Sequence, residues 1–449
     1  MPESPHNSGE TSGPTPLTLL LQLPRALRDP LPTFVSWRDR YGDVVKVPLT
    51  RPQVYQIFNP ADVRHVLVNG QQNYRKAGGL VIGRLLLGEG LLASNEPLHS
   101  RHRRMVQPAF QRQRIDALPE RVAAIAAPML DAWPAGSTID VARAMALLTL
   151  AVVGSVMFGD DLSHDASALI DAFVECQRFI QGTPILPRTF PTPRRRRYLE
   201  AIRFIDSVVL RMIAERRVAG ERPDDLLSIL IAARDEHGNP LTDREIRDEI
   251  VTILLAGHET TANALAWGWY LLASHPVIYD RLHDEVHRVL GNRMPRAGDM
   301  AGLCYVELVF NESLRMYPPA WILAREAACD DVLPTGTRVT TGDQMIMFSY
   351  AIHRDPRWFP NPDEFQPERF RPEATRLLPP CSFIPFGAGP RGCMGESFAR
   401  VESTILIAMI MQRFELLLVP GQRIEAEPLL TLRPRRGILM TVTRRTPGP

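Results

Sequence analysis

The feature that most constrains the fold is a long helical pattern without proline, which begins at Thr242. Thr242 and Glu245 have the spacing of a capping box, in which each side chain bonds a backbone N–H group of the other residue and fixes a helix start. The pattern continues to His275, just before Pro276, over roughly 30 residues or about 45 Å. A helix of that length must cross the whole body of the protein, so the pattern predicts a fold built around it.

The middle of this pattern is polar, with the sequence Ala256-Gly257-His258-Glu259-Thr260-Thr261. A threonine inside a helix can donate a hydrogen bond to the carbonyl four residues earlier, which loosens or bends the helix. We expect this bond between Thr260 and Ala256. A polar patch that faces solvent is the alternative, and the apolar flanks 253–255 and 262–269 count against it.

A glycine-rich loop, Phe386-Gly-Ala-Gly-Pro-Arg-Gly-Cys-Met-Gly395, precedes an apolar helical pattern over residues 398–414. Unpaired N–H groups and the dipole at a helix N-terminus favour a thiolate, which is the form that binds iron, so Cys393 is a candidate metal ligand. Two alternatives are a buried structural cysteine and a dinucleotide-binding G-x-G-x-x-G after a possible strand at 382–386. The 54 residues after Gly395 leave no room for a dinucleotide-binding fold.

Composition limits the class of protein. The chain has 449 residues, 45% of them hydrophobic, and a net charge of +2, which gives no strong bias towards nucleic acid or membrane. Its five cysteines are scattered without a C-x-x-C pair, which argues against disulfides and fits a reducing, cytosolic setting. No apolar run reaches the roughly 18 residues of a membrane span. We therefore predict a soluble, cytoplasmic protein without a membrane anchor.

The order of patterns along the chain predicts mainly α structure with small β-sheets (α+β). Residues 1–16 are expected to be a disordered tail, and 17–449 a single domain. Residues 43–47 and 53–58 should form a hairpin. Helices are expected at 166–181 and 198–217, joined by a proline-rich hinge at 184–193 that could act as a lid.

Three further clusters carry charge. His99 and Arg103 lie four residues apart at the start of a basic helix and so share one face. Glu312 and Arg315 lie one turn apart on a helix that ends before Pro318-Pro319, and Arg369 in a proline-dense coil at 359–370 could reach Glu312. Taken alone, each cluster is also compatible with an ordinary charged surface or a helix ion pair.

Together these stretches resemble the cytochrome P450 family of haem-thiolate monooxygenases over nearly the full chain. The cysteine loop matches F-x-x-G-x-R-x-C-x-G, and residues 256–261 match A/G-G-x-D/E-T-T. Glu312 and Arg315 match E-x-x-R, and residues 367–370 match P-E-R-F. Four motifs in the family's order make coincidence a poor explanation. The resemblance implies a helical prism with haem b between the long helix and the cysteine loop.

The resemblance also implies roles for single residues. Cys393 would be the proximal ligand of the haem iron, and Phe386 would pack beside the haem. The haem propionates would be bound by a set of basic side chains, namely Arg391, His99, Arg103 and Arg325. Glu312, Arg315 and Arg369 would form a structural charge network. Thr260 and Glu259 would be the acid–alcohol pair that delivers protons for the activation of O2.

The family further implies chemistry and partners. We expect a monooxygenase that hydroxylates or epoxidises a hydrophobic small molecule, such as a terpenoid, fatty acid or steroid-like compound, in a pocket lined by 80–92, 173–185, Ala256, 319–323 and 430–432. Electrons would come from NAD(P)H through a reductase and a ferredoxin or flavodoxin, which would dock near Arg101, Arg103, Arg104 and Arg112 of a monomer. The alternatives are a haem-thiolate isomerase or peroxygenase without a reductase, and a flavin- or NAD-dependent oxidoreductase.

Overall fold

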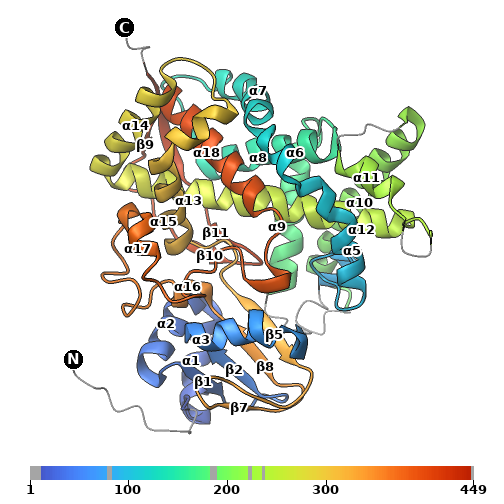
Figure 1. Cartoon of the computed structure of the whole chain (residues 1–449), viewed down its shortest axis with the longest axis vertical. Coiled ribbons are helices and arrows are strands. Elements are labelled where there is room, and N and C mark those ends of the chain that lie inside the picture. The colour runs from blue at the N-terminus through green and yellow to red at the C-terminus, as the bar shows by residue number, and fades with distance from the viewer. Residues whose placement is uncertain (1–11, 78–82, 183–189, 221–224, 235–237, 446–449) are drawn as a thin grey trace. The chain divides into compact units, whose positions relative to one another are not determined.

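The computed structural model describes residues 12–77, 83–182, 190–220, 225–234 and 238–445 (Figure 1). Its contacts divide the chain into two compact units. The first unit holds the described residues of 1–80, 315–364 and 368–393, and the second holds those of 81–314, 365–367 and 394–449. The prediction of mainly α structure with small sheets is confirmed. The prediction of one domain over 17–449 stays a prediction.

The first unit is built on a five-stranded sheet in the order β1-β2-β8-β5-β3, beside which lie helices α1 to α3 (Figure 1). The predicted hairpin is confirmed, because β1 and β2 pair antiparallel with Val44 opposite Ile57. β2 also pairs with β8 in parallel, so Val54 lies opposite Gln344. This register joins two segments that are far apart in the sequence.

The elements of the first unit are short. Its helices are α1 Pro16–Arg28, α2 Pro30–Tyr41, α3 Pro60–Arg64, η1 His65–Asn69, η2 Gln71–Asn73, α16 Ser349–Ile352, α17 Pro372–Thr375 and η8 Gly389–Arg391. Its strands are β1 Val44–Val47, β2 Val54–Ile57, β3 Tyr74–Lys76, β5 Leu323–Ala327, β6 Asp331–Val332, β7 Arg338–Val339 and β8 Gln344–Met347.

The second unit is mainly helical, and its longest feature is the predicted central rod. Helix α12, the π-helical turn η5 and helix α13 follow one another without a break from Asp243 to Ser274, and Figure 1 shows α12 and α13 in line. The rod is apolar around most of its circumference, and Trp267 and Trp269 in α13 are almost completely buried. It therefore forms the core of this unit rather than its surface.

The elements of the second unit surround this rod. Its helices are α4 Arg84–Leu87, α5 Leu98–Val106, η4 Gln107–Phe110, α6 Arg112–Asp116, α7 Leu118–Asp131, α8 Val141–Phe158, α9 Ala166–Gln181, α10 Pro193–Ala219, α11 Leu226–Ala232, α12 Asp243–Leu254, η5 Leu255–Glu259, α13 Thr260–Ser274, α14 Pro276–Leu290, η6 Ala297–Gly302 and α18 Glu396–Arg413. Its strands are β4 Thr138–Asp140, β9 Phe414–Leu418, β10 Ala426–Pro428, β11 Leu432–Pro434 and β12 Leu439–Arg444. Helix α15 Cys304–Met316 and the turn η7 Pro367–Phe370 span the boundary between the units.

Several predicted boundaries differ from the structure. No strand forms at 382–386, where the backbone makes turns, and the coil at 359–370 ends in the 3-10 turn η7. Helix α10 begins at Pro193 rather than at 198, because proline is well tolerated in the first turn of a helix. Residues 1–11 of the expected tail and 184–189 of the expected hinge lie outside the described residues.

Helix α8 corrects one sequence expectation. It has 18 residues with a mean hydropathy of 2.0, so in length and composition it could cross a membrane, contrary to the prediction that no run was long enough. A buried core helix has the same properties, and most of α8 is buried in the second unit, where it packs on α13. This helix is therefore weak support for a membrane span.

Candidate active site

The polar motif of the central rod forms a π-helical turn. The capping box that starts the rod is confirmed: the Thr242 N–H group donates to Glu245 Oε2 at 2.8 Å, and the Glu245 N–H group donates to Thr242 Oγ1 at 3.2 Å. At the motif, Thr260 Oγ1 donates to the Ala256 carbonyl at 2.6 Å, as predicted. Single π turns inside α-helices occur frequently at functional sites.

The acid and the alcohol of this motif have different surroundings. Glu259 is buried, and its Oε2 accepts a hydrogen bond from Gln177 Nε2 of α9. Its Oε1 accepts from Thr431 Oγ1, in the turn between β10 and β11, at 2.7 Å. Thr260, in contrast, is half-buried, and Ala256 one turn earlier is exposed. The carboxylate is thus held by two neutral donors, while the hydroxyl is accessible.

Gln177 and Thr431 lie within the segments predicted to line the pocket, but the sequence did not indicate that they hold Glu259. Thr431 also accepts a hydrogen bond from Asn263 Nδ2 at 3.0 Å, so both the turn and the rod contribute to the cluster. Gln177 is completely buried on an otherwise apolar face of α9. A lone glutamine on such a face is a signal that could have found it, since a buried amide needs a partner.

Residues 386–393 of the cysteine loop lie in the first unit and are closed by their own backbone. The Cys393 N–H group donates to the Phe386 carbonyl at 2.9 Å, and the Gly392 N–H group donates to the Gly389 carbonyl at 2.9 Å. Gly389 has a φ of +71°, and a Cβ there would lie 2.0 Å from the carbonyl oxygen of Leu67, so only glycine fits. Cys393 itself is exposed.

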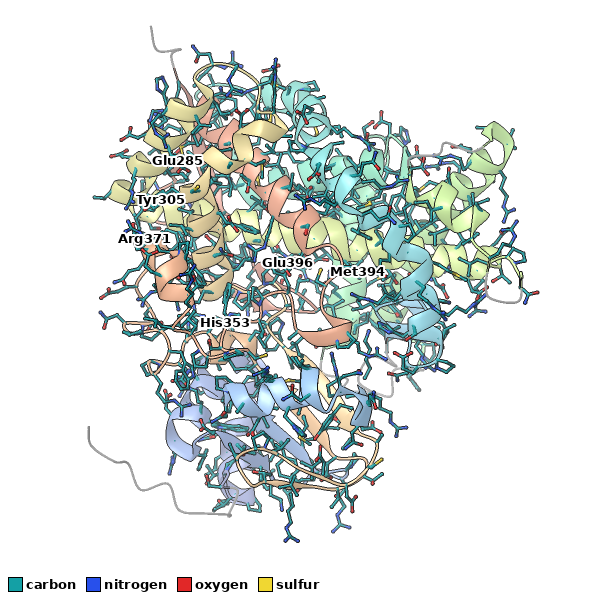
Figure 2. The ribbon with its side chains drawn as sticks, viewed as in Figure 1. Glu285, Tyr305, His353, Arg371, Met394 and Glu396 are labelled. Carbon is teal, nitrogen blue, oxygen red and sulfur yellow. The ribbon has the colours of Figure 1, made fainter. Side chains whose placement is uncertain are left out.

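The loop runs directly into α18. Gly395 is the N-cap of this helix, and the labelled residues Met394 and Glu396 mark the junction in Figure 2. Glycine has no side chain to cap the first N–H groups of the helix. Those groups, which follow Cys393 closely in the sequence, therefore remain able to stabilise a negative charge.

Arg391 of the loop lies near a second guanidinium group, that of Arg325 in β5. Burial, and then the positive charge of Arg391, lowers the pKa of Arg325 to about 10. The hydrogen bond of Arg325 is to the Ala324 carbonyl, at 2.9 Å, and within the described ranges it has no carboxylate partner. Two nearby cations of this kind favour binding of an added carboxylate.

The other two predicted propionate ligands lie in the second unit, on α5. His99 is buried, with Nδ1 3.1 Å from Glu96 Oε1, and Arg103 is half-buried one turn later. The next histidine, His102, is also buried and lies 2.7 Å from Glu249 Oε1 of α12. This buried pair fixes α5 to the central rod and so fixes the face that carries His99 and Arg103.

Helix α15 carries Glu312 and Arg315, and its start is capped by another helix. Glu285 of α14 accepts hydrogen bonds from the N–H groups of Tyr305, at 2.8 Å, and Val306, at 3.1 Å; Figure 2 labels Glu285 and Tyr305. Glu312 is fully buried and accepts from the Gln366 N–H group at 2.9 Å. Helix α15 is thus anchored both at its start and to the proline-dense coil.

Within the first unit, Arg315 and Arg369 bind the same coil. Arg315 donates to the carbonyls of His353, at 3.0 Å, and Glu364, at 3.2 Å, and Arg369 donates to that of Asn361, at 2.8 Å. The predicted contact of Arg369 with Glu312 stays a prediction.

His353, labelled in Figure 2, is a further residue that the sequence did not reveal. Its Nε2 accepts the Ile384 N–H group at 2.9 Å, which assigns the ring proton to Nδ1. It therefore links Arg315 to the segment that leads into the cysteine loop.

A comparison with protein families decides the identity. The model of the family described as "Cytochrome P450" matches residues 11–442. The chain belongs to the cytochrome P450 family. It is accordingly a monooxygenase of the haem-dependent class. The dinucleotide interpretation of the glycines fails, because no strand precedes this P450 loop.

Three relatives are similar along nearly their whole length. Cyclooctatin synthase of Streptomyces melanosporofaciens is 36% identical, over 90% of this chain and 89% of its own. Cyclooctat-9-en-7-ol 5-monooxygenase of the same species is 36% identical, over 94% of this chain and 92% of its own. Pentalenene oxygenase of Streptomyces avermitilis is 32% identical, over 94% of both chains.

The residues of this P450 fit the haem that its family implies. The exposed thiol beside an uncapped helix start has the chemistry of an iron ligand, and the Arg325–Arg391 pair has that of a carboxylate site. When bound, the haem supplies the activation of O2. The surrounding protein must supply ligation, charge compensation and protons.

A first prediction concerns the donors that hold Glu259 in this P450. Gln177→Leu would leave one carboxylate oxygen buried without its amide donor, so the free energy of unfolding should fall by about 1–3 kcal/mol. Chemical denaturation measures this change. Gln181→Leu, at the exposed end of the same helix, is the control and should leave the stability nearly unchanged. An equal loss in both variants would contradict a specific bond to Glu259.

Glu402 of α18 is buried against the rod and gives a second prediction. Burial raises its pKa well above the usual 4.5, and the hydroxyl of Thr261 only partly offsets this rise. A carboxyl group with a raised pKa stabilises the fold fully below its unfolded pKa, and this contribution is lost as pH rises towards the folded pKa. Above about pH 4.5 the stability of the wild-type protein should therefore fall by up to about 1.4 kcal/mol per pH unit from this group.

The variant Glu402→Gln isolates this effect because its amide does not titrate. Denaturation at several pH values from about 5 upwards should show that the difference in stability, wild type minus variant, decreases as pH rises. A constant difference across that range would mean that Glu402 titrates normally.

Proposed function

We propose that this cytochrome P450 hydroxylates or epoxidises a cyclic, terpenoid-like hydrocarbon in bacterial secondary metabolism. The observation that carries the oxygenase part is the π turn with an accessible Thr260 and a buried, hydrogen-bonded Glu259. The substrate class is supported by the relatives, whose names specify an unsaturated alcohol, cyclooctat-9-en-7-ol, and an unsaturated hydrocarbon, pentalenene.

In this proposal each residue has a defined task. Cys393 binds the haem iron as thiolate, and Phe386 packs beside the haem. Four basic side chains would bind the propionates: Arg325, Arg391, His99 and Arg103. Thr260 accepts a hydrogen bond from water and Glu259 acts as the proton reservoir behind it. Glu312, Arg315 and Arg369 keep the supporting coil in place.

The substrate pocket is proposed from the predicted lining segments. Within them, residues 80–82 and 183–185 lie outside the described residues, so part of the predicted lining has no structural account. Of the rest, Leu86 and Leu87 of α4 are buried and Ala256 is exposed on the rod. Aliphatic surfaces of this kind favour a hydrophobic substrate.

Electrons are proposed to come from NAD(P)H through a reductase and a ferredoxin or flavodoxin. Arg104 and Arg112 are exposed and would attract an acidic partner, although Arg112 also lies 3.8 Å from Asp116. Arg101 is instead paired with Glu245 at 2.6 Å. We further propose that the chain acts as a monomeric, single-domain protein of the cytoplasm.

Reconstitution of the purified protein with a bacterial ferredoxin, its reductase and NADPH tests this function. With pentalenene as the probe, we expect an oxygenated product that incorporates an atom of labelled O2. Product formation from hydrogen peroxide alone, or a rearranged product without any electron donor, would instead support a peroxygenase or isomerase. Binding of the probe should also shift the Soret absorption band.

A further inference from the structure

Helix α1 of the first unit turns its apolar side to solvent. Its sequence is PLTLLLQLPRALR, and none of its 13 residues is buried. Leu17 is 67% exposed, Leu20 57%, Leu21 74% and Leu27 57%. These positions follow the i, i+3, i+4 spacing of a single helical face, so their exposure forms one stripe.

Half-buried residues of α1, among them Leu19, Gln22 and Ala26, lie on the opposite side, which faces the protein. Gln22 accepts a hydrogen bond from the indole N–H group of the buried Trp37 on α2, at 2.8 Å. Thr18 lies at the capped start of the helix, bonded to Thr15. The contact of Gln22 with Trp37 therefore fixes the rotation of α1, and this rotation leaves five of its six leucines exposed.

The charges of α1 indicate what covers the leucine stripe. The helix contains Arg25 and Arg28, both exposed, and no acidic residue. A second copy of the same helix would add more arginines without an acid on α1 to pair with them. A lipid surface with an apolar interior and negatively charged head groups complements both the leucine stripe and the two arginines.

We propose that α1 lies on anionic lipid, with its leucine stripe in the interface and its two arginines at the phosphate groups. Thirteen residues are too few to cross a bilayer, which needs about 20, so the helix would lie in the plane of the surface. Such binding is peripheral and is independent of the substrate proposed above.

Sedimentation of the full-length protein with vesicles tests this proposal. Vesicles of phosphatidylcholine mixed with phosphatidylglycerol should bind the protein, and those of phosphatidylcholine alone should bind it less. The triple variant Leu17→Ser/Leu20→Ser/Leu21→Ser should bind at least about tenfold more weakly. The variant Arg25→Gln/Arg28→Gln should lose the preference for phosphatidylglycerol and the sensitivity to salt.

A matched control removes apolar side chains that are even more exposed, elsewhere on the protein, in the variant Val218→Ser/Val277→Ser/Leu377→Ser. This control should bind like the wild type. Thermal unfolding checks each variant, and the single change Leu21→Ser replaces the triple if the latter unfolds. Equal binding by the leucine variant and the wild type would overturn the proposal. The proposal would also be overturned if the wild type formed a dimer, the leucine variant were monomeric, and neither protein bound to vesicles.

Discussion

In a Cys393→Ser variant, product formation should fall to the background rate. A serine hydroxyl stays protonated at neutral pH, whereas a thiol next to a helix start is stabilised as the thiolate that binds iron. The loop backbone should persist, because the N–H group of residue 393 bonds the Phe386 carbonyl whatever the side chain. The measurement is the absorption spectrum of the reduced protein with carbon monoxide, in which the far-red-shifted band of sulfur-ligated haem should be lost.

Cys381→Ser is the matched control for this experiment. Cys381 lies in the same coil of the first unit, twelve residues earlier, and is half-buried. This variant should keep both the spectral band and the product. Retention of the band by Cys393→Ser would assign the iron ligand to another residue and remove the basis of the proposed site.

The parts of the fold that could be predicted are those determined by residues close together in the sequence. The central rod is specified by its capping box and by the lack of proline up to Pro276, and its π turn by the short-range bond from Thr260. The sheet of the first unit is different. Its β2–β8 pairing joins residues about 290 positions apart, and no local pattern encodes such a register.

The site shows the same division between local and non-local causes. Glu259 and Thr260 are recognisable because they are neighbours in one motif. The donors that hold Glu259 come from 82 residues before it and 172 residues after it, so their role depends on tertiary packing. These donors change the interpretation of the motif. Glu259 is restrained by two neutral groups, and of the pair only Thr260 is accessible.

This arrangement predicts the effect of Thr260→Ala. The single proton of the Thr260 hydroxyl is bonded to the Ala256 carbonyl, so its oxygen is left to accept a hydrogen bond from water. Without the hydroxyl of Thr260, NADPH and O2 should still be consumed, but the product formed per NADPH should fall by about 10²-fold, and peroxide should accumulate. Thr260→Ser keeps the hydroxyl and should retain most of the coupling. Unchanged coupling in Thr260→Ala would refute a role in proton delivery.

A double variant distinguishes a relay from two independent contributions. If Glu259 supplies protons only through water held by Thr260, then Glu259→Gln should impair coupling to a similar degree as Thr260→Ala. The double variant should then be little worse than either single variant, because one broken step already stops the relay. Multiplicative losses would show that the two residues act separately. In that case the bonds from Gln177 and Thr431 would serve only to stabilise a buried carboxylate, and the function of Thr260 would not depend on its neighbour.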